Sequence, residues 1–222
     1  LHRLIVTSQF YQLTSLQRRS AGPLTPEQRD SEARDPDNRL LWKFPESRMQ
    51  AEVVRDSLLS VAGELDLTPG GHEIDHREGL KSRRRSLYFA HHGEEKMEFL
   101  ELFDAANACD CYRRTSSVQP QQALALTNSE LTGNLSRVLA GKLWQRSLST
   151  AEPASRFVQL SFLQILNRSP TPQELQASMD FLQTQSKRLA DAGQAAAAAE
   201  SVSDPDTRAR ENLIHALMNH ND

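Results

Sequence analysis

Apolar residues recur three and four positions apart through most of the second half of the chain, and this spacing constrains the fold more than any other feature. Successive stripes predict helices that begin near residues 120, 131, 157, 171 and 204. Start signals stand at Pro120, at 171–174 (Thr-Pro-Gln-Glu) and at Asp204-Pro205. In each, proline suits the first helical position, and the hydroxyl or carboxylate of the last two can cap the helix. We predict a mainly α fold, with five to seven helices around one core.

One further helix is expected in the first half of the chain. Ser47 is a suitable cap and Gly63 a suitable stop, and an apolar stripe lies between them at Met49, Val53, Val54, Leu58, Val61 and Ala62. Burial of about six such side chains, at about 1.5–3 kcal/mol each, would make this helix a main contributor to the core.

The remaining segments are polar, and their boundaries define the domain organisation that we expect. Residues 17–46 are interpreted as a long polar excursion, and residues 66–118 as a loop-rich segment with a strand over 85–90 and at most a small β-hairpin near 84–91. Residues 119–222 form a helical half with a variable, Ala-rich connector at 190–204. We therefore expect residues 1–222 to form one mostly helical domain. Because the chain opens on Leu1 in structured sequence, we interpret it as a fragment of a larger protein.

Composition excludes several classes of protein. The 222 residues carry 26 basic and 29 acidic side chains, a net charge of −3, which excludes a nucleic-acid binder driven by bulk charge. There is no run of about 18 apolar residues, so no membrane span is expected in this fragment. The two cysteines, Cys109 and Cys111, are too few for a disulfide framework and lack the spacing of a zinc or haem motif, so we expect free thiols, with a strained bridge between them or a redox role as the alternative.

Seven phrases stand in order along the chain: LHRLIVTS, DPDNRLLWKFP, RMQAEVVRDSLLSVAGELD, RRSLYF, FLELFDA, CYRRTSSVQPQQALALTNSEL and RSPTPQEL. Together they resemble the C-terminal domain of unknown function of large planctomycete surface or exported proteins that often carry an N-terminal cytochrome c-type domain. The resemblance implies an extracytoplasmic location, upstream domains of the same protein as partners, and a place in the breakdown of polysaccharide, including sulfated polysaccharide. It implies no cofactor on this fragment, since c-type haem would belong to an absent upstream domain.

Polar residues around 113–128 are the ligand-binding candidates. Arg113 and Arg114 offer planar forks of donors suited to the carboxylate or sulfate of an anionic glycan. The alternative is structural, with one arginine pairing with Asp104 to pin a loop. The amides of Gln121 and Asn128 suit either a polar ligand or the capping of backbone groups. A second basic run, 81–85, is interpreted as solvated surface in which one arginine pairs with a nearby carboxylate: Asp66, Asp75 or Glu78.

Carboxylates at 98–104 are the catalytic candidates. Glu98, Glu101 and Asp104 would need a partner across a cleft, such as Asp56 or Glu52, to hydrolyse a polysaccharide. No metal site is expected, because the histidine pairs 72/76 and 91/92 lack a third ligand at a known place. The sequence therefore favours an accessory, interaction or ligand-binding domain of an exported, cytochrome-linked protein, with a polysaccharide hydrolase as the alternative.

Overall fold

The computed structural model describes residues 1–13, 15, 25–45, 47–93, 96–107, 109–110, 117–195 and 204–220. Over these residues the chain is mainly helical, as predicted, with two short 3-10 helices, η1 (His76–Glu78) and η2 (Ser86–Tyr88). None of the helices described is long and apolar enough to cross a membrane. The α-helices are α1 (His2–Val6), α2 (Pro26–Arg34), α3 (Ala51–Val61), α4 (Glu98–Leu102), α5 (Pro120–Asn128), α6 (Glu130–Ser147), α7 (Pro153–Leu166), α8 (Pro172–Ala195) and α9 (Pro205–Met218).

Contacts divide the chain into two compact units, residues 1–49 and residues 50–221. The first unit holds α1 and α2 and a turn built around Asp35. The Asp35 carboxylate accepts the backbone N–H groups of Arg39 and Leu40 at 2.9 and 2.7 Å. The Phe10 and Phe44 rings pack with their centroids 5.5 Å apart. This unit is therefore held by turn hydrogen bonds and one aromatic cluster.

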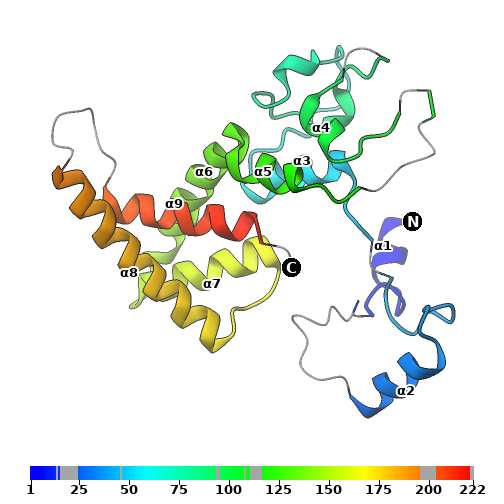
Figure 1. The fold of residues 1–222 in the computed structure, drawn as a ribbon, viewed down its shortest axis with the longest axis horizontal. Coiled ribbons are helices and arrows are strands. Elements are labelled where there is room, and N and C mark those ends of the chain that lie inside the picture. Colours follow the sequence, from blue (N-terminus) through cyan, green and yellow to red (C-terminus); the bar gives the residue numbers. More distant parts are fainter. Residues whose placement is uncertain are drawn as a thin grey trace. The chain divides into compact units, whose positions relative to one another are not determined.

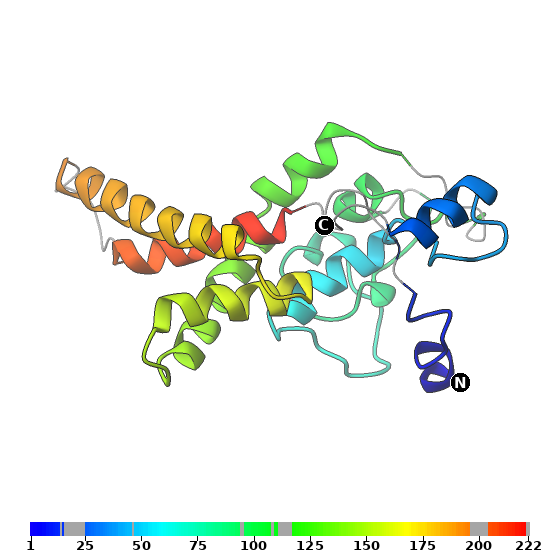
Figure 2. The same cartoon turned by 90° about the horizontal axis from the view of Figure 1, so that it is seen from below.

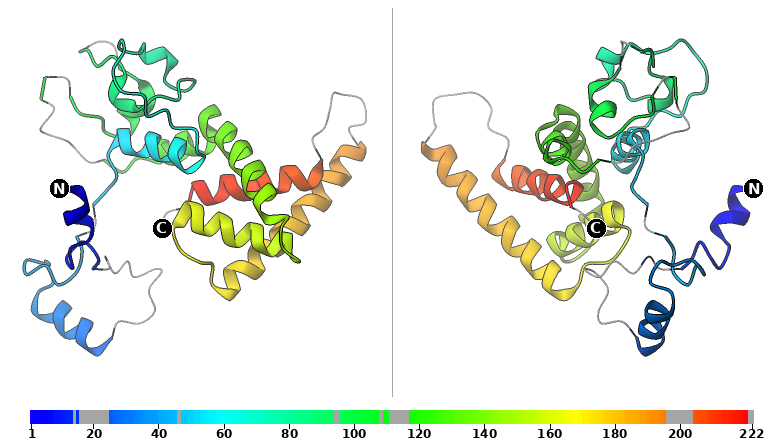
Figure 3. Two further views of the ribbon diagram at one scale, coloured as in Figure 1. Left: turned by 180° about the vertical axis from the view of Figure 1, so that it is seen from behind. Right: turned by 45° about the vertical axis from the view of Figure 1, so that its right-hand side comes forward.

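The second unit contains the hydrophobic core. Helices α6 to α9 pack on one another as a bundle, in which α8 and α9 lie side by side (Figures 1 and 2). Helix α3 contacts α6 of this bundle and also contacts α4 and η2 of the loop-rich segment (Figure 3). Phe157, Leu143 and Ile214 are among the most deeply buried residues. The seven helices α3–α9 around this core agree with the predicted architecture.

Helix α3 buries only part of the predicted stripe: Leu58 and Ala62 are buried and Val54 and Val61 pack against the core, whereas Met49 and Val53 are half exposed. Its N-cap is Gln50 rather than Ser47, and Val53 remains 44 % exposed. The buried stripe comprises Ala51, Arg55, Leu58 and Leu59. The prediction was wrong here because it left an arginine out of the core-facing positions. The stop at Gly63 is confirmed, since Gly63 adopts a positive φ of 66°.

The strand expected over 85–90 is also wrong. The segment forms the 3-10 helix η2, between two isolated parallel bridges, Asp66 with Arg84 and Ile74 with Phe89. The N–H of Ser86 donates to the side chain of Asp56, and the carbonyl of Arg84 accepts from the side chain of Arg55. Side chains of α3 thus occupy backbone groups that a strand would offer to a neighbouring strand.

Candidate functional site

Arg55 is a fully buried arginine of α3 whose side chain contacts the loop-rich segment. Its side chain has 0 % exposure and donates hydrogen bonds to the carbonyls of Gly79, Ser82 and Arg84. The guanidinium also lies over the Phe89 ring, 4.8 Å from the centroid. Burial lowers the pKa of Arg55 to about 10, although Asp56 opposes the shift. Arg55 is therefore still protonated at neutral pH.

Asp56, the next residue of α3, binds the same segment through its carboxylate. Its Oδ1 accepts the N–H of Ser86 at 2.8 Å and the hydroxyl of Ser86 at 2.6 Å. Oδ1 also lies 3.6 Å from Nη1 of Arg55, and Oδ2 lies 3.7 Å from Nε of Arg85. One carboxylate thus lies between two guanidinium groups.

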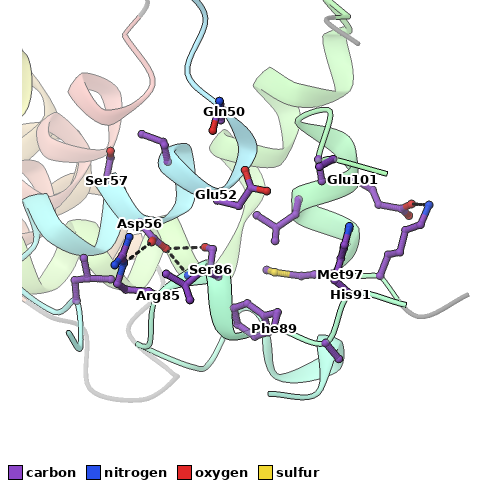
Figure 4. Close-up of a pocket in the computed structure, with 18 of the residues that line it drawn as sticks. Gln50, Glu52, Asp56, Ser57, Arg85, Ser86, Phe89, His91, Met97 and Glu101 are labelled. Carbon is purple, nitrogen blue, oxygen red and sulfur yellow. Dashed lines mark hydrogen bonds and ion pairs between the residues drawn. The ribbon is translucent and has the colours of Figure 1, made fainter. Parts of the chain in front are cut away.

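A pocket of about 710 Å³ opens beside this cluster, and we call it the α3–α4 pocket. Asp56, Arg85 and Ser86 gather at one side of it and Glu101 stands at the other, with Glu52 between them (Figure 4). The lining residues are Gln50, Glu52, Val53, Asp56, Ser57, Ser60, Leu65, Leu67, Arg85, Ser86, Leu87, Phe89, Ala90, His91, Lys96, Met97, Leu100, Glu101, Ala105 and Ala106. Polar and apolar side chains share one concave surface.

The side of the pocket formed by α4 carries a second ion pair. Nζ of Lys96 lies 2.8 Å from Oε1 of Glu101, and His91 lines the same side. Met97 and Leu100 form apolar surface beside this pair, and both are buried. This side therefore offers both signs of charge next to apolar atoms.

The three predicted catalytic carboxylates fall in different surroundings. Glu101 lines the α3–α4 pocket, and Glu98 is exposed on α4. Asp104 accepts the N–H and the hydroxyl of Ser117 at 2.8 and 2.7 Å and has a positive φ of 61°. Glu52 and Asp56, weighed as partners for them, also line the pocket.

The predicted ligand-binding residues are only partly placed. Arg113 and Arg114 lie outside the described residues, as does Cys111, so a pairing of either arginine with Asp104 stays a prediction. Gln121 and Asn128 are exposed on α5. The amide that α5 buries belongs instead to Gln122, which donates to the carbonyls of Leu102 and Ser117 at 2.9 and 3.2 Å.

The basic run is surface, as predicted, since Lys81, Arg83 and Arg85 are exposed, and its arginines also have partners. Arg83 pairs with Glu64, and Arg84 lies over the Tyr88 ring, 4.1 Å from the centroid. Arg85 pairs with Asp56. The carboxylates nearest to Arg83 and Arg85 are thus not the ones suggested by proximity in the sequence. They come from α3 and the residues just after it.

The sequence model of one protein family matches residues 1–182. This range ends within α8 and includes every residue that lines the α3–α4 pocket. The chain belongs to the PSD1 family of proteins of unknown function (DUF1553). No curated protein and no solved structure matches the chain. The predicted membership of a family without known function is thereby confirmed.

In this PSD1 chain, sequence reasoning named Asp56 as a possible partner carboxylate but missed Arg55, the buried residue beside it. Arg55 and Asp56 stand within an apolar stripe of α3, where two adjacent charges are unusual. Arg55 follows Ala51 by four positions and precedes Leu58 by three, so all three share one helix face. An arginine in register with Ala51 and Leu58 was the sequence signal that a polar cluster lies beneath α3.

Proposed function

We propose that this chain is an accessory, ligand-binding domain and that the α3–α4 pocket binds a short oligosaccharide. The observation that carries the proposal is the composition of the pocket. Ser57, Ser60 and Gln50 offer groups that both donate and accept hydrogen bonds, next to the apolar side chains of Val53 and Leu87. A sugar ring also combines hydroxyls around its edge with an apolar C–H face.

The carboxylates that line the pocket already have partners, and this favours binding over catalysis. Asp56 lies against two guanidinium groups and Ser86, and Glu101 pairs with Lys96. A general acid must be placed to reach the glycosidic oxygen, whereas these carboxylates already contact neighbouring cations and a serine. These carboxylates are better suited to accept hydrogen bonds from hydroxyls than to transfer protons.

The wider setting of the domain follows from the sequence resemblance. We propose an extracytoplasmic protein whose upstream domains carry a cytochrome c-type module and which serves polysaccharide breakdown, including that of sulfated polysaccharide. The chain would then hold a saccharide for another part of the same machinery.

Titration calorimetry of the purified chain with neutral and acidic tetrasaccharides tests the proposal. Val53→Trp places an indole in the pocket lining and should abolish binding. Leu163→Trp is the matched control, because Leu163 is a 54 % exposed apolar residue on α7, outside the pocket. If neither neutral nor acidic saccharides bind, or if both variants bind as the wild type does, the proposal is overturned.

A polysaccharide hydrolase is the second candidate, and one observation favours it. Glu52 and Glu101 come from different helices and line the same pocket, as two carboxylates must in order to act on one glycosidic bond. This candidate predicts release of reducing ends from a polysaccharide, and its loss in both Glu52→Gln and Glu101→Gln. Binding without release by the wild type would favour the accessory domain.

A further inference from the structure

We infer that the side of the α3–α4 pocket formed by Arg85 is a subsite for an anionic substituent of the ligand, a carboxylate or a sulfate. This inference rests on the proposed function and specifies the chemistry of the saccharide. It assigns to Arg85 the anion recognition that the sequence suggested for Arg113 and Arg114.

The first step is the charge at this side. Asp56 lies 3.6 Å from Arg55 and 3.7 Å from Arg85, so two guanidinium groups share one carboxylate. Both arginines are protonated at neutral pH, and the cluster therefore keeps one net positive charge. Arg55 cannot meet a ligand, because it is fully buried and bound to loop carbonyls. The available cation is Arg85.

The second step is the set of donors that Arg85 offers. Its side chain is 48 % exposed and lines the pocket, and Nε is the atom that faces Asp56. Within the described part of the chain, Nη1 and Nη2 of Arg85 bond to no residue. Two parallel Nη–H donors match the two oxygens of a carboxylate or of a sulfate edge.

The third step is the remaining charge around the pocket. Lys96 and Glu101 neutralise each other on the α4 side, and Glu52 adds a carboxylate between the two sides. A hydroxyl of the ligand near Glu52 can donate a hydrogen bond to its carboxylate. We therefore expect an anion of the ligand beside Arg85 and hydroxyl groups of the ligand beside Glu52.

The test compares tetragalacturonate, a sulfated carrageenan tetrasaccharide, a neutral agar tetrasaccharide and sodium sulfate alone. We expect the wild type to bind at least one of the two charged saccharides about ten- to a hundred-fold more tightly than the neutral one, because charge-assisted hydrogen bonds are strong. Arg85→Ala should remove that advantage and leave the affinity for the neutral saccharide unchanged. The advantage should also shrink as ionic strength rises.

The matched control is Arg83→Ala. Arg83 belongs to the same basic run, is 65 % exposed and pairs with Glu64, but it does not line the pocket. The affinities of the Arg83→Ala variant for the saccharides should stay within about twofold of the wild-type values, the range expected for a remote surface charge. Arg85→Lys keeps the positive charge without the planar fork, and we expect it to recover only part of the loss.

The outcomes separate this inference from the proposed function. Equal binding of charged and neutral saccharides, or an Arg85→Ala variant that behaves as wild type, overturns the anion subsite and leaves saccharide binding standing. If no saccharide binds, the proposed function fails. In that case a saturable sulfate-induced NMR shift of the Ser86 backbone N–H that is lost in Arg85→Ala supports the subsite, and no shift in the wild type overturns it too. The carboxylated and sulfated saccharides show which anion it selects.

Discussion

Arg55 and Asp56 are adjacent on α3 and hold the same loop through opposite chemistry. Arg55 donates to the carbonyls of Gly79 and Arg84, both at 2.9 Å, and Asp56 accepts the N–H of Ser86 at 2.8 Å. Donor and acceptor groups of residues 79–86 are thus satisfied from one turn of α3. The loop that supplies Arg85 to the pocket owes its shape to this pair.

Replacing Arg55 by an apolar residue should be strongly destabilising. Arg55→Leu leaves the loop carbonyls buried without a donor and leaves Asp56 with one cation fewer. We expect a loss of about 3–5 kcal/mol in the free energy of unfolding, measured by urea denaturation, as when one partner of a buried ion pair is removed.

The control for this variant is Arg156→Leu, since Arg156 is exposed on α7. It should change the free energy of unfolding by no more than about 0.5 kcal/mol. Comparable effects of the two variants would show that the buried hydrogen bonds contribute little. Arg55→Lys should fall between the two, because it keeps a charge but loses the fork.

A side chain at Gly79 should collide with Met97. A Cβ at this position would collide with the thioether of Met97, which is buried and lines the α3–α4 pocket. Gly79→Ala should therefore displace Met97 and cost about 1–3 kcal/mol, as overpacking does. In the Met97→Ala background, the same substitution should cost clearly less. Equal costs in both backgrounds, measured by urea denaturation, would contradict the collision.

Two neighbouring glutamines on α5 should respond differently to truncation. Gln122 is buried and bridges the carbonyls of Leu102 and Ser117, whereas Gln121 is exposed. Gln122→Ala should cost about 1–3 kcal/mol in thermal or urea unfolding, because buried acceptors lose their donor. Gln121→Ala should be nearly neutral in stability. A reversed order would show that the assignment of the buried amide is wrong.

Helix starts could be predicted from the sequence because they depend on residues within one turn. The capping box of α8 is formed as expected, with Thr171 and Glu174 exchanging hydrogen bonds of 2.7 and 3.2 Å between side chain and backbone. Asp204 likewise caps α9 through the N–H of Thr207 at 3.1 Å. Each signal contains its own partner, so no tertiary information is needed.

The buried face of α3 could not be predicted in this way. Arg55 is buried because carbonyls 24 to 29 positions further along the chain accept hydrogen bonds from its guanidinium group. Periodicity treats any arginine as a surface residue, so it placed the stripe on Val53 and Met49, which are half exposed. The candidate site was therefore predicted only in part: Glu52, Asp56 and Glu101 were named from the sequence and line the pocket, but the role of Arg55 depends on that long-range contact.

Acid should remove part of the stability that Glu174 provides to the start of α8. Its hydrogen bonds with Arg168, at 2.8 and 2.9 Å, are the main cause that lowers the pKa of Glu174 from 4.5 to about 2. A lowered pKa stabilises the fold above the unfolded value, so the contribution is complete above about pH 5 and declines as pH falls from 4.5 towards 2. Because the side chain is one-third exposed, solvent screening limits this contribution to about 1 kcal/mol. The stability difference between wild type and Glu174→Gln should therefore narrow over that range in urea titrations.

NMR titration provides the independent check: the carboxyl of Glu174 should titrate nearer 4.5 in Arg168→Ala, and a wild-type value already near 4.5 would contradict the assignment.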